Sequence, residues 1–187
     1  MQELNADAYT STGLLPSDST DTAILLQVIS SESLNDFVDG LNASDQQWLQ
    51  RQSFTGKAGQ VAWLENGQGV IGSTGADSLS TLGHLPYLLP EGVYRLTDDA
   101  SFIALLGWGL GSYRFDRYKQ ADRQPAQLIL PDSADAAELV NTVAASNLAR
   151  DLINTPAQDM APSHLQAEVE FFNDTATTEI YTTVGDA

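Results

Sequence analysis

The hydrophobic pattern of the chain alternates between short apolar runs and longer stripes at helical spacing. Apolar runs of strand length, bounded by turn residues, occur at residues 21–30, 60–64, 69–73, 93–96 and 126–130. The second and third runs flank Asn66-Gly67, a dipeptide typical of tight β-hairpins. Because a hairpin joins antiparallel strands, we predict a mixed sheet rather than a purely parallel one.

Apolar residues at helical spacing predict helices between and after these strands. Their expected positions are 34–41, a short segment after Ser44, 77–89, 100–118, 134–153 and 163–170. Pro86 must kink or end the helix at 77–89, because proline lacks an amide proton. Asn154-Thr155-Pro156 ends the helix at 134–153, since the residue before a proline avoids helical backbone. Strands that alternate with helices predict the α/β class.

Composition limits the size and the chemistry of the protein. Its 187 residues suffice for one domain, or for one domain and a fragment of another. The lack of cysteine in the sequence excludes a disulfide framework, a thiolate metal site and a cysteine nucleophile. The formal net charge of −17, from 8 Lys and Arg against 25 Asp and Glu, opposes binding to nucleic acids or anionic membranes. We therefore expect neither kind of partner.

Residues 1–20 are polar and rich in Ser, Thr and Asp. They show neither the basic start nor the apolar stretch of a secretory signal peptide, and we expect a flexible N-terminus there. Along the sequence, no apolar run approaches the roughly 18–20 residues of a membrane span. We therefore expect a cytoplasmic protein.

The sequence Gly107-Trp108-Gly109-Leu110-Gly111 is a candidate phosphate loop, because bare backbone amides can approach an anion. However, it lacks the third-glycine spacing of a dinucleotide-binding loop and lies inside an apolar helical run. The alternative is close helix packing, since Gly107 and Gly111 share a helix face with Ala104. We favour packing, which must offset a cost of about 1 kcal/mol for each glycine relative to alanine.

Half of the positive charges, Arg114, Arg117, Lys119 and Arg123, lie in one stretch beside three aromatic residues. Cations interleaved with aromatics can bind the phosphates and bases of a nucleic acid. The alternative is the C-terminal end of the helix at 100–118, where cations face the negative end of the helix dipole and Asp116 can pair locally. The acidic net charge of the chain favours the helix end.

The histidines and acids form no metal site that the sequence reveals. His84 has no acidic residue within four positions, and His164 has only Glu168, whereas a hydrolytic zinc site usually has three protein ligands. We expect both histidines at the surface or at helix ends. Pairs of acids lie at expected helix starts or loops, where capping alone favours them: Asp98-Asp99, Asp132/Asp135 and Asp151/Asp159.

Two longer motifs carry a family resemblance. Residues 147–162 read N-L-A-R-D-L-I-N-T-P-A-Q-D-M-A-P, and residues 107–119 read G-W-G-L-G-S-Y-R-F-D-R-Y-K. Both resemble hallmarks of the leucyl aminopeptidases, the cytosol aminopeptidase family. In that family the first motif marks the junction between a linker helix and the catalytic domain. The resemblance covers residues 21–170.

The resemblance implies a three-layer, macro-like α/β domain at 21–133, a linker helix at 134–153 and the start of a truncated catalytic domain at 154–170. Complete family enzymes are usually hexamers in which two divalent ions, manganese or zinc, activate water to remove N-terminal residues from peptides. The ions are bound in segments such as V-G-K-G-x-T-F-D-S-G-G, which have no counterpart in this sequence. We therefore assign no catalytic, cofactor-binding or metal-binding residue, interpret Asp151 and Asp159 as structural, and expect this chain to be inactive alone.

The end of the sequence resembles a translated oligonucleotide. Residues 173–182 read N-D-T-A-T-T-E-I-Y-T, which is the first-frame translation of the sequencing adapter AATGATACGGCGACCACCGAGATCTACAC. A chance match over so many consecutive positions is very improbable. We therefore expect the natural reading frame to stop near Glu170 and residues 171–187 to be an artefact of library preparation.

Two alternative functions follow from the same resemblance. A macro-like domain can hold ADP-ribose at the carboxyl ends of its strands, and residues 72–75 (G-S-T-G) form the loop that would invite it. The domain can instead serve interaction or oligomerisation. Without a catalytic domain, the linker helix would expose an apolar stripe, which favours association or aggregation: Val143, Leu148, Leu152 and Ile153.

Overall fold

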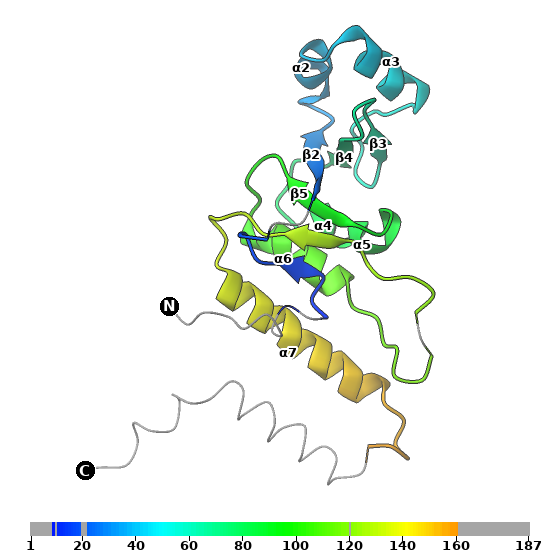
Figure 1. Ribbon diagram of the computed structural model, residues 1–187, viewed down its shortest axis with the longest axis vertical. Helices are drawn as coiled ribbons and strands as arrows, with labels where there is room; N and C mark the ends of the chain where they lie inside the picture. The colour runs from blue at the N-terminus through cyan, green and yellow to red at the C-terminus, as the bar shows by residue number, and fades with distance from the viewer. Residues whose placement is uncertain (1–8, 10, 20–21, 120, 161–187) are drawn as a thin grey trace, which may run out of the picture. The chain divides into compact units, whose positions relative to one another are not determined.

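A computed structural model of the chain describes residue 9 and residues 11–19, 22–119 and 121–160. The chain divides into two units, of which the first ends at Asn147 and the second begins at Leu148. The first unit is an α/β domain built on one sheet (Figure 1). The expected helix at 163–170 and the adapter-like segment lie outside the described residues.

The sheet has six strands in the order β1-β6-β5-β2-β4-β3. Their bounds are Leu14–Leu15 (β1), Ile24–Ser30 (β2), Val61–Trp63 (β3), Gly69–Ser73 (β4), Val93–Leu96 (β5) and Gln127–Ile129 (β6). Only the β3–β4 pair is antiparallel among these, and Asn66 and Gly67 lie in its turn, where Gly67 has a φ of +86°. The prediction of a mixed sheet is therefore confirmed.

The helices follow the strands and are mostly short. Their bounds are Leu34–Asp39 (α2), Ala43–Arg51 (α3), Ser80–Gly83 (α4), Leu85–Leu88 (α5), Phe102–Gly111 (α6) and Ala136–Asn154 (α7). Asn42 caps α3 by accepting hydrogen bonds from the amides of Ser44 and Asp45. Asp135 starts α7 in the same way, because its carboxylate accepts from the amide of Glu138 at 3.1 Å.

The prediction of a flexible segment at 1–20 is wrong for its second half. Leu14 and Leu15 pair with Leu128 and Ile129 of β6, and Leu14 is fully buried. The Gly13 carbonyl accepts from the Leu128 amide at 2.9 Å and from the Trp108 indole at 3.0 Å, which ties the segment to both β6 and α6. The sequence did not predict this strand, because two apolar residues within a polar segment show no hydrophobic periodicity.

Two predicted helices are shorter in the structure. The one expected at 77–89 is divided into α4 and α5 at His84, just before Pro86. The one expected at 100–118 ends at Gly111, where the amide and hydroxyl of Ser112 both donate to the Trp108 carbonyl at 3.0 Å. The residues after Ser112 therefore belong to a loop and not to a helix.

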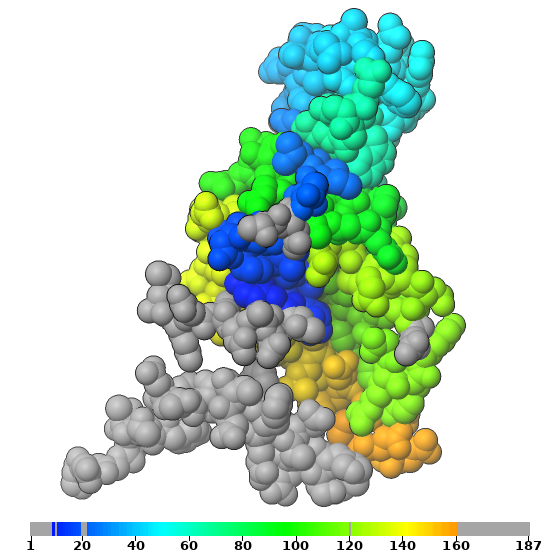
Figure 2. Space-filling view, in the orientation of Figure 1, coloured from blue at the N-terminus to red at the C-terminus, as the bar shows by residue number. Residues whose placement is uncertain are grey.

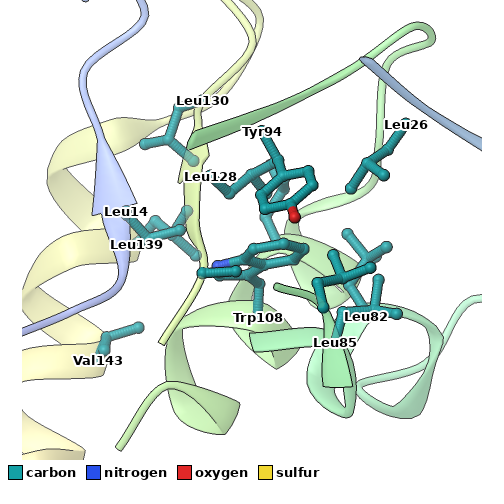
Figure 3. Close-up of a cluster of buried hydrophobic side chains, with 14 of the residues drawn as sticks. Leu14, Leu26, Leu82, Leu85, Tyr94, Trp108, Leu128, Leu130, Leu139 and Val143 are labelled. Atoms are coloured by element: carbon teal, nitrogen blue, oxygen red, sulfur yellow. The ribbon is translucent and has the colours of Figure 1, made fainter. Parts of the chain in front are cut away.

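The strands separate two hydrophobic clusters. On one face, alternate strand residues such as Leu26, Tyr94 and Leu128 pack with the buried residues of α4, α5, α6 and α7 (Figure 3). On the other face, Ile29, Ala62 and Val70 pack with Leu49 of α3 and residues of α2. Figure 2 shows α2, α3 and the β3–β4 hairpin, coloured blue to blue-green, gathered at one end of this unit. We call the two groups the large cluster and the small cluster.

Helix α7 carries the apolar stripe that the sequence predicts. Leu139, Val140 and Val143 are buried in the large cluster, and the helix bounds differ from the expected 134–153 by two residues at its start and one at its end. Farther along, Ile153 is 82% exposed. In the described part of the chain, no helix combines the length and the apolar character needed to cross a bilayer.

Candidate functional site

A crevice of about 380 Å³ opens at the carboxyl ends of the central parallel strands. The loop after β4, residues 74–79, forms one wall, and the loop after β5, residues 97–101, forms the other. Strand β2 lies between β4 and β5 and contributes Leu26 and Val28 to the floor.

The position of this crevice follows from the topology of the sheet. The chain leaves β2 through α2 and α3 on the small-cluster face, whereas it leaves β4 and β5 through helices on the large-cluster face. Neighbouring strands therefore send their connections to opposite faces of the sheet. Open α/β sheets bind ligands at such a switch point, outside the carboxyl ends of the strands.

The crevice has an apolar floor and an acidic rim. Leu26, Leu82 and Ala104 are buried in the floor, and the side chains of Asp77, Asp98 and Asp99 are exposed at the rim. Hydroxyl groups hold the three carboxylates: Ser101 donates to Asp77, Thr97 to Asp98 at 3.0 Å and Ser133 to Asp99 at 3.1 Å. Ser101 also caps α6, since its hydroxyl oxygen accepts from the Ala104 amide.

A second cavity of about 380 Å³ lies beside the first and shares Leu96, Asp98 and Asp99 with it. It is formed by the ends of β5 and β6, and it contains Arg95 as well as Asp132. Because a cation and several acids share this second cavity, its charge selects no ligand class. The first crevice is therefore the better defined site.

Ser73 and Gly75 line the crevice, and both belong to the loop at residues 72–75 that the sequence offers as an alternative ADP-ribose site. Gly75 makes the turn after β4 with a φ of +77°, and its amide donates to the Ser73 hydroxyl at 3.1 Å. Gly72 is required for packing, because a Cβ there would overlap the backbone of Lys57. The three rim carboxylates would repel a pyrophosphate group, so the charge of the crevice argues against ADP-ribose.

The glycines of α6 pack helices together, as expected. A Cβ at Gly107 would overlap the Leu79 carbonyl, one at Gly111 would overlap the Gly83 carbonyl, and one at Gly109 would overlap the Val143 side chain. These contacts bring α6 against α4 and α7. The segment at 107–111 is therefore not a phosphate loop.

The cationic stretch does not form the helix end that the sequence predicted. Helix α6 has no basic residue in its last turn, and Arg114, Arg117 and Lys119 follow in the loop. Arg123 has a structural role, because its guanidinium lies 5.9 Å from the centre of the Tyr87 ring and donates to the carbonyls of Pro86 and Leu89.

His84 lies at the end of α4, as expected, with Nδ1 3.0 Å from the Ser80 carbonyl oxygen. His164 lies outside the described residues. Within the described ranges, no group of three or more His, Cys, Asp or Glu side chains could hold a metal ion. The acid pair Asp98-Asp99 joins the crevice, whereas Asp135 caps α7.

The sequence did not single out Asp77, which the fold brings to the same crevice as Asp98 and Asp99. The sequence feature that could have identified Asp77 is its position, a few residues after the end of an apolar run of strand length. Acids that follow neighbouring parallel strands meet at one edge of the sheet. That signal requires the strand order, and the sequence alone does not give the strand order.

Comparison with known proteins identifies the family. A model described as the M17 aminopeptidase N-terminal domain matches residues 24–131. The chain belongs to this family. The crevice between the loops after β4 and β5 therefore lies within an M17 N-terminal domain.

Solved structures agree with this assignment. The crystal structure of cytosol aminopeptidase from Coxiella burnetii is 31% identical, with a TM-score of 0.77 over 87% of this chain and 38% of that chain. Two more distant structures share the fold: a mutant of tomato leucine aminopeptidase, and the bottromycin maturation enzyme BotP. The first is 17% identical with a TM-score of 0.55, covering 87% of this chain and 42% of that one. The second is 21% identical with a TM-score of 0.57, covering 83% and 38%.

The M17 chain thus spans about two fifths of the length of the solved structures that it matches. No curated protein sequence matches it.

Proposed function

We propose that this chain is the N-terminal, non-catalytic part of a longer leucyl aminopeptidase and does not hydrolyse peptides alone. The observation that carries the proposal is the family match at residues 24–131, combined with coverage of only 38% of the Coxiella burnetii enzyme. In the matched part, Asp77, Asp98 and Asp99 lie at the rim of the crevice and form no metal site with other described residues.

The longer enzyme would use two divalent ions, manganese or zinc, to polarise the peptide carbonyl and activate water. The described residues of this chain do not fit such a centre, because they contain no group of three possible ligand side chains. The metal ligands, the peptide substrates and assembly into hexamers would therefore belong to the longer enzyme. A cytoplasmic location is part of the same proposal.

Hydrolysis of leucine p-nitroanilide tests the proposal. The purified chain, with added Mn²⁺ or Zn²⁺, is expected to release no p-nitroaniline above the blank. The full-length Coxiella burnetii aminopeptidase in the same assay is the positive control. Turnover that rises in proportion to the chain and follows it through successive purification steps would overturn the proposal.

A small-ligand module is the second candidate function, and the crevice at the carboxyl ends of β2, β4 and β5 favours it. ADP-ribose is the ligand that the resemblance to macro domains suggests, although the acidic rim would repel its diphosphate. Calorimetry with ADP-ribose measures binding of this ligand directly. Saturable heat would establish the module, and its absence would remove this ligand.

We also propose that residues 173–182 derive from an adapter. Sequencing of the source DNA across codon 170 is the corresponding test. A natural frame that continues through N-D-T-A-T-T-E-I-Y-T would exclude an adapter origin.

A further inference from the structure

The crevice combines an apolar floor with a rim whose charged groups are all negative. Asp77, Asp98 and Asp99 form the rim, and no Lys, Arg or His occurs among the described residues that line it. We propose that this crevice binds a small organic cation, consisting of a primary ammonium group on an aliphatic body. This proposal does not depend on the proposed aminopeptidase role.

The floor supports the aliphatic part of such a ligand. Val28, Leu96 and Ala100 are partly exposed and give the crevice its apolar surface, and the buried Leu26 and Leu82 lie beneath them. A volume of about 380 Å³ falls within the range of small-molecule sites, which is roughly 300–1,000 Å³. An alkyl chain in this space would lose its contact with water, and that loss drives binding.

The rim supports the ammonium group. Asp77 comes from the loop after β4, and Asp98 and Asp99 come from the loop after β5, so carboxylates stand on both walls of the crevice. Each carboxylate accepts one hydroxyl hydrogen bond, and its remaining lone pairs stay available. An ammonium group has three donors and no acceptor, which matches this set of acceptors.

Other ligand classes fit less well. A divalent metal ion requires several oxygen ligands in one shell, and the described acids form no such group. A phosphate or carboxylate ligand would face three like charges. The apolar floor also gives no contact to a bare ion, whereas it accepts the body of an organic cation.

A charge series on one aliphatic body tests the proposal. We would titrate the full ¹⁵N-labelled chain with hexylamine, hexanol and hexanoate at neutral pH, and follow backbone amide shifts by NMR. Hexylamine is expected to shift the amides of residues 74–79 and 97–101, with a dissociation constant on the order of 1 mM. Hexanol is expected to bind about three- to tenfold more weakly, and hexanoate more weakly still, since exposed ion pairs contribute modestly.

Matched variants separate the charge from the cavity. Asp77→Asn with Asp98→Asn keeps the shape of the rim and is expected to weaken hexylamine about three- to tenfold while leaving hexanol unchanged. Asp36→Asn with Asp39→Asn alters net charge equally on exposed positions of α2 and is expected to leave both titrations unchanged. Ala76→Leu fills the crevice from its exposed wall and is expected to abolish binding of both compounds.

Salt gives an independent measure of the charge. Raising NaCl from about 0.05 to 0.5 M should weaken hexylamine and not hexanol, because ions screen only the charged pair.

Several results would each overturn the proposal. These are hexylamine that binds no more tightly than hexanol, shifts that persist in Ala76→Leu, equal losses in the α2 control, and no shift at all at ligand concentrations of about 10 mM.

Discussion

The two hydrophobic clusters differ in size and in how they are closed. The large cluster surrounds Trp108, and its helices approach closely at glycine residues. The Trp108 indole and the Tyr94 phenol both donate to backbone carbonyls. The small cluster has few buried residues and is framed by polar side chains that bond the backbone. The Gln52 amide, for example, exchanges hydrogen bonds with the Trp63 backbone at 2.7 and 2.9 Å.

This difference shows two ways in which one sheet is covered. On the large-cluster face, several helices interlock, so most of the stabilisation comes from packing of apolar surface. On the small-cluster face, Asp45 is 6% exposed and accepts from the Glu65 amide at 2.9 Å, which ties α3 to the hairpin. If packing dominates on the large-cluster face, substitutions there should destabilise the fold more than those on the small-cluster face.

Trp108→Ala should be the most destabilising change. The side chain is fully buried, lies 6.4 Å from the Tyr94 ring centre and donates to the Gly13 carbonyl. We expect a loss of about 3–5 kcal/mol in the free energy of unfolding, measured by urea denaturation. Trp48→Ala is the control, since Trp48 is 41% exposed on α3, and it should cost much less. Equal losses would contradict the dominant role of the large cluster.

Leu49→Ala should cost about 2–3 kcal/mol, because Leu49 is 3% exposed at the centre of the small cluster. Leu88→Ala, at a position 53% exposed, removes the same atoms and should have little effect. Because β2 and β4 contribute to both clusters, we expect a single unfolding transition in both variants. Two separate transitions in Leu49→Ala would show that the clusters unfold independently.

Gly107→Ala should cost about 1–3 kcal/mol, because the new methyl group would overlap the Leu79 carbonyl and push α6 away from α4. Gly40→Ala, at the end of α2, places its methyl group at ordinary distance from the Phe37 carbonyl oxygen, 3.4 Å away. Its cost should therefore be near zero. Thermal melting of the pair measures the difference, and a neutral Gly107→Ala would rule out close packing of α6 on α4 at Gly107.

Tyr94→Phe should alter the pH dependence of stability. Burial raises the pKa of the Tyr94 phenol above 10.0, and Arg123 opposes this in part. The folded state therefore favours the neutral phenol, so this contribution is complete below pH 10 and is lost as pH rises above it. Between pH 8 and about 11, Tyr94→Phe should lose less stability than the wild type. The exposed Tyr118→Phe should behave like the wild type, and an equal decline in all three would exclude Tyr94 as the cause.

Local patterns were sufficient for most of the elements. The strand at 93–96 and the hairpin around Asn66-Gly67 followed from apolar runs and turn chemistry, and the stripe of α7 followed from helical spacing. The candidate site was predicted only in part, since the sequence indicated Asp98-Asp99 as an acid pair but did not indicate Asp77.

The α/β class, the mixed sheet and the family followed from the amino-acid sequence, because they depend on local periodicity and on motifs that are contiguous in the chain. Three-dimensional contacts were needed to show that Leu14 and Leu15 form a strand, that α6 ends at Gly111 and that two distant loops enclose an acidic crevice. Each of these depends on partners far away in the sequence, such as Gly13 with Trp108. Pairing and packing between distant segments have no period along the chain, and so the sequence pattern could not reveal them.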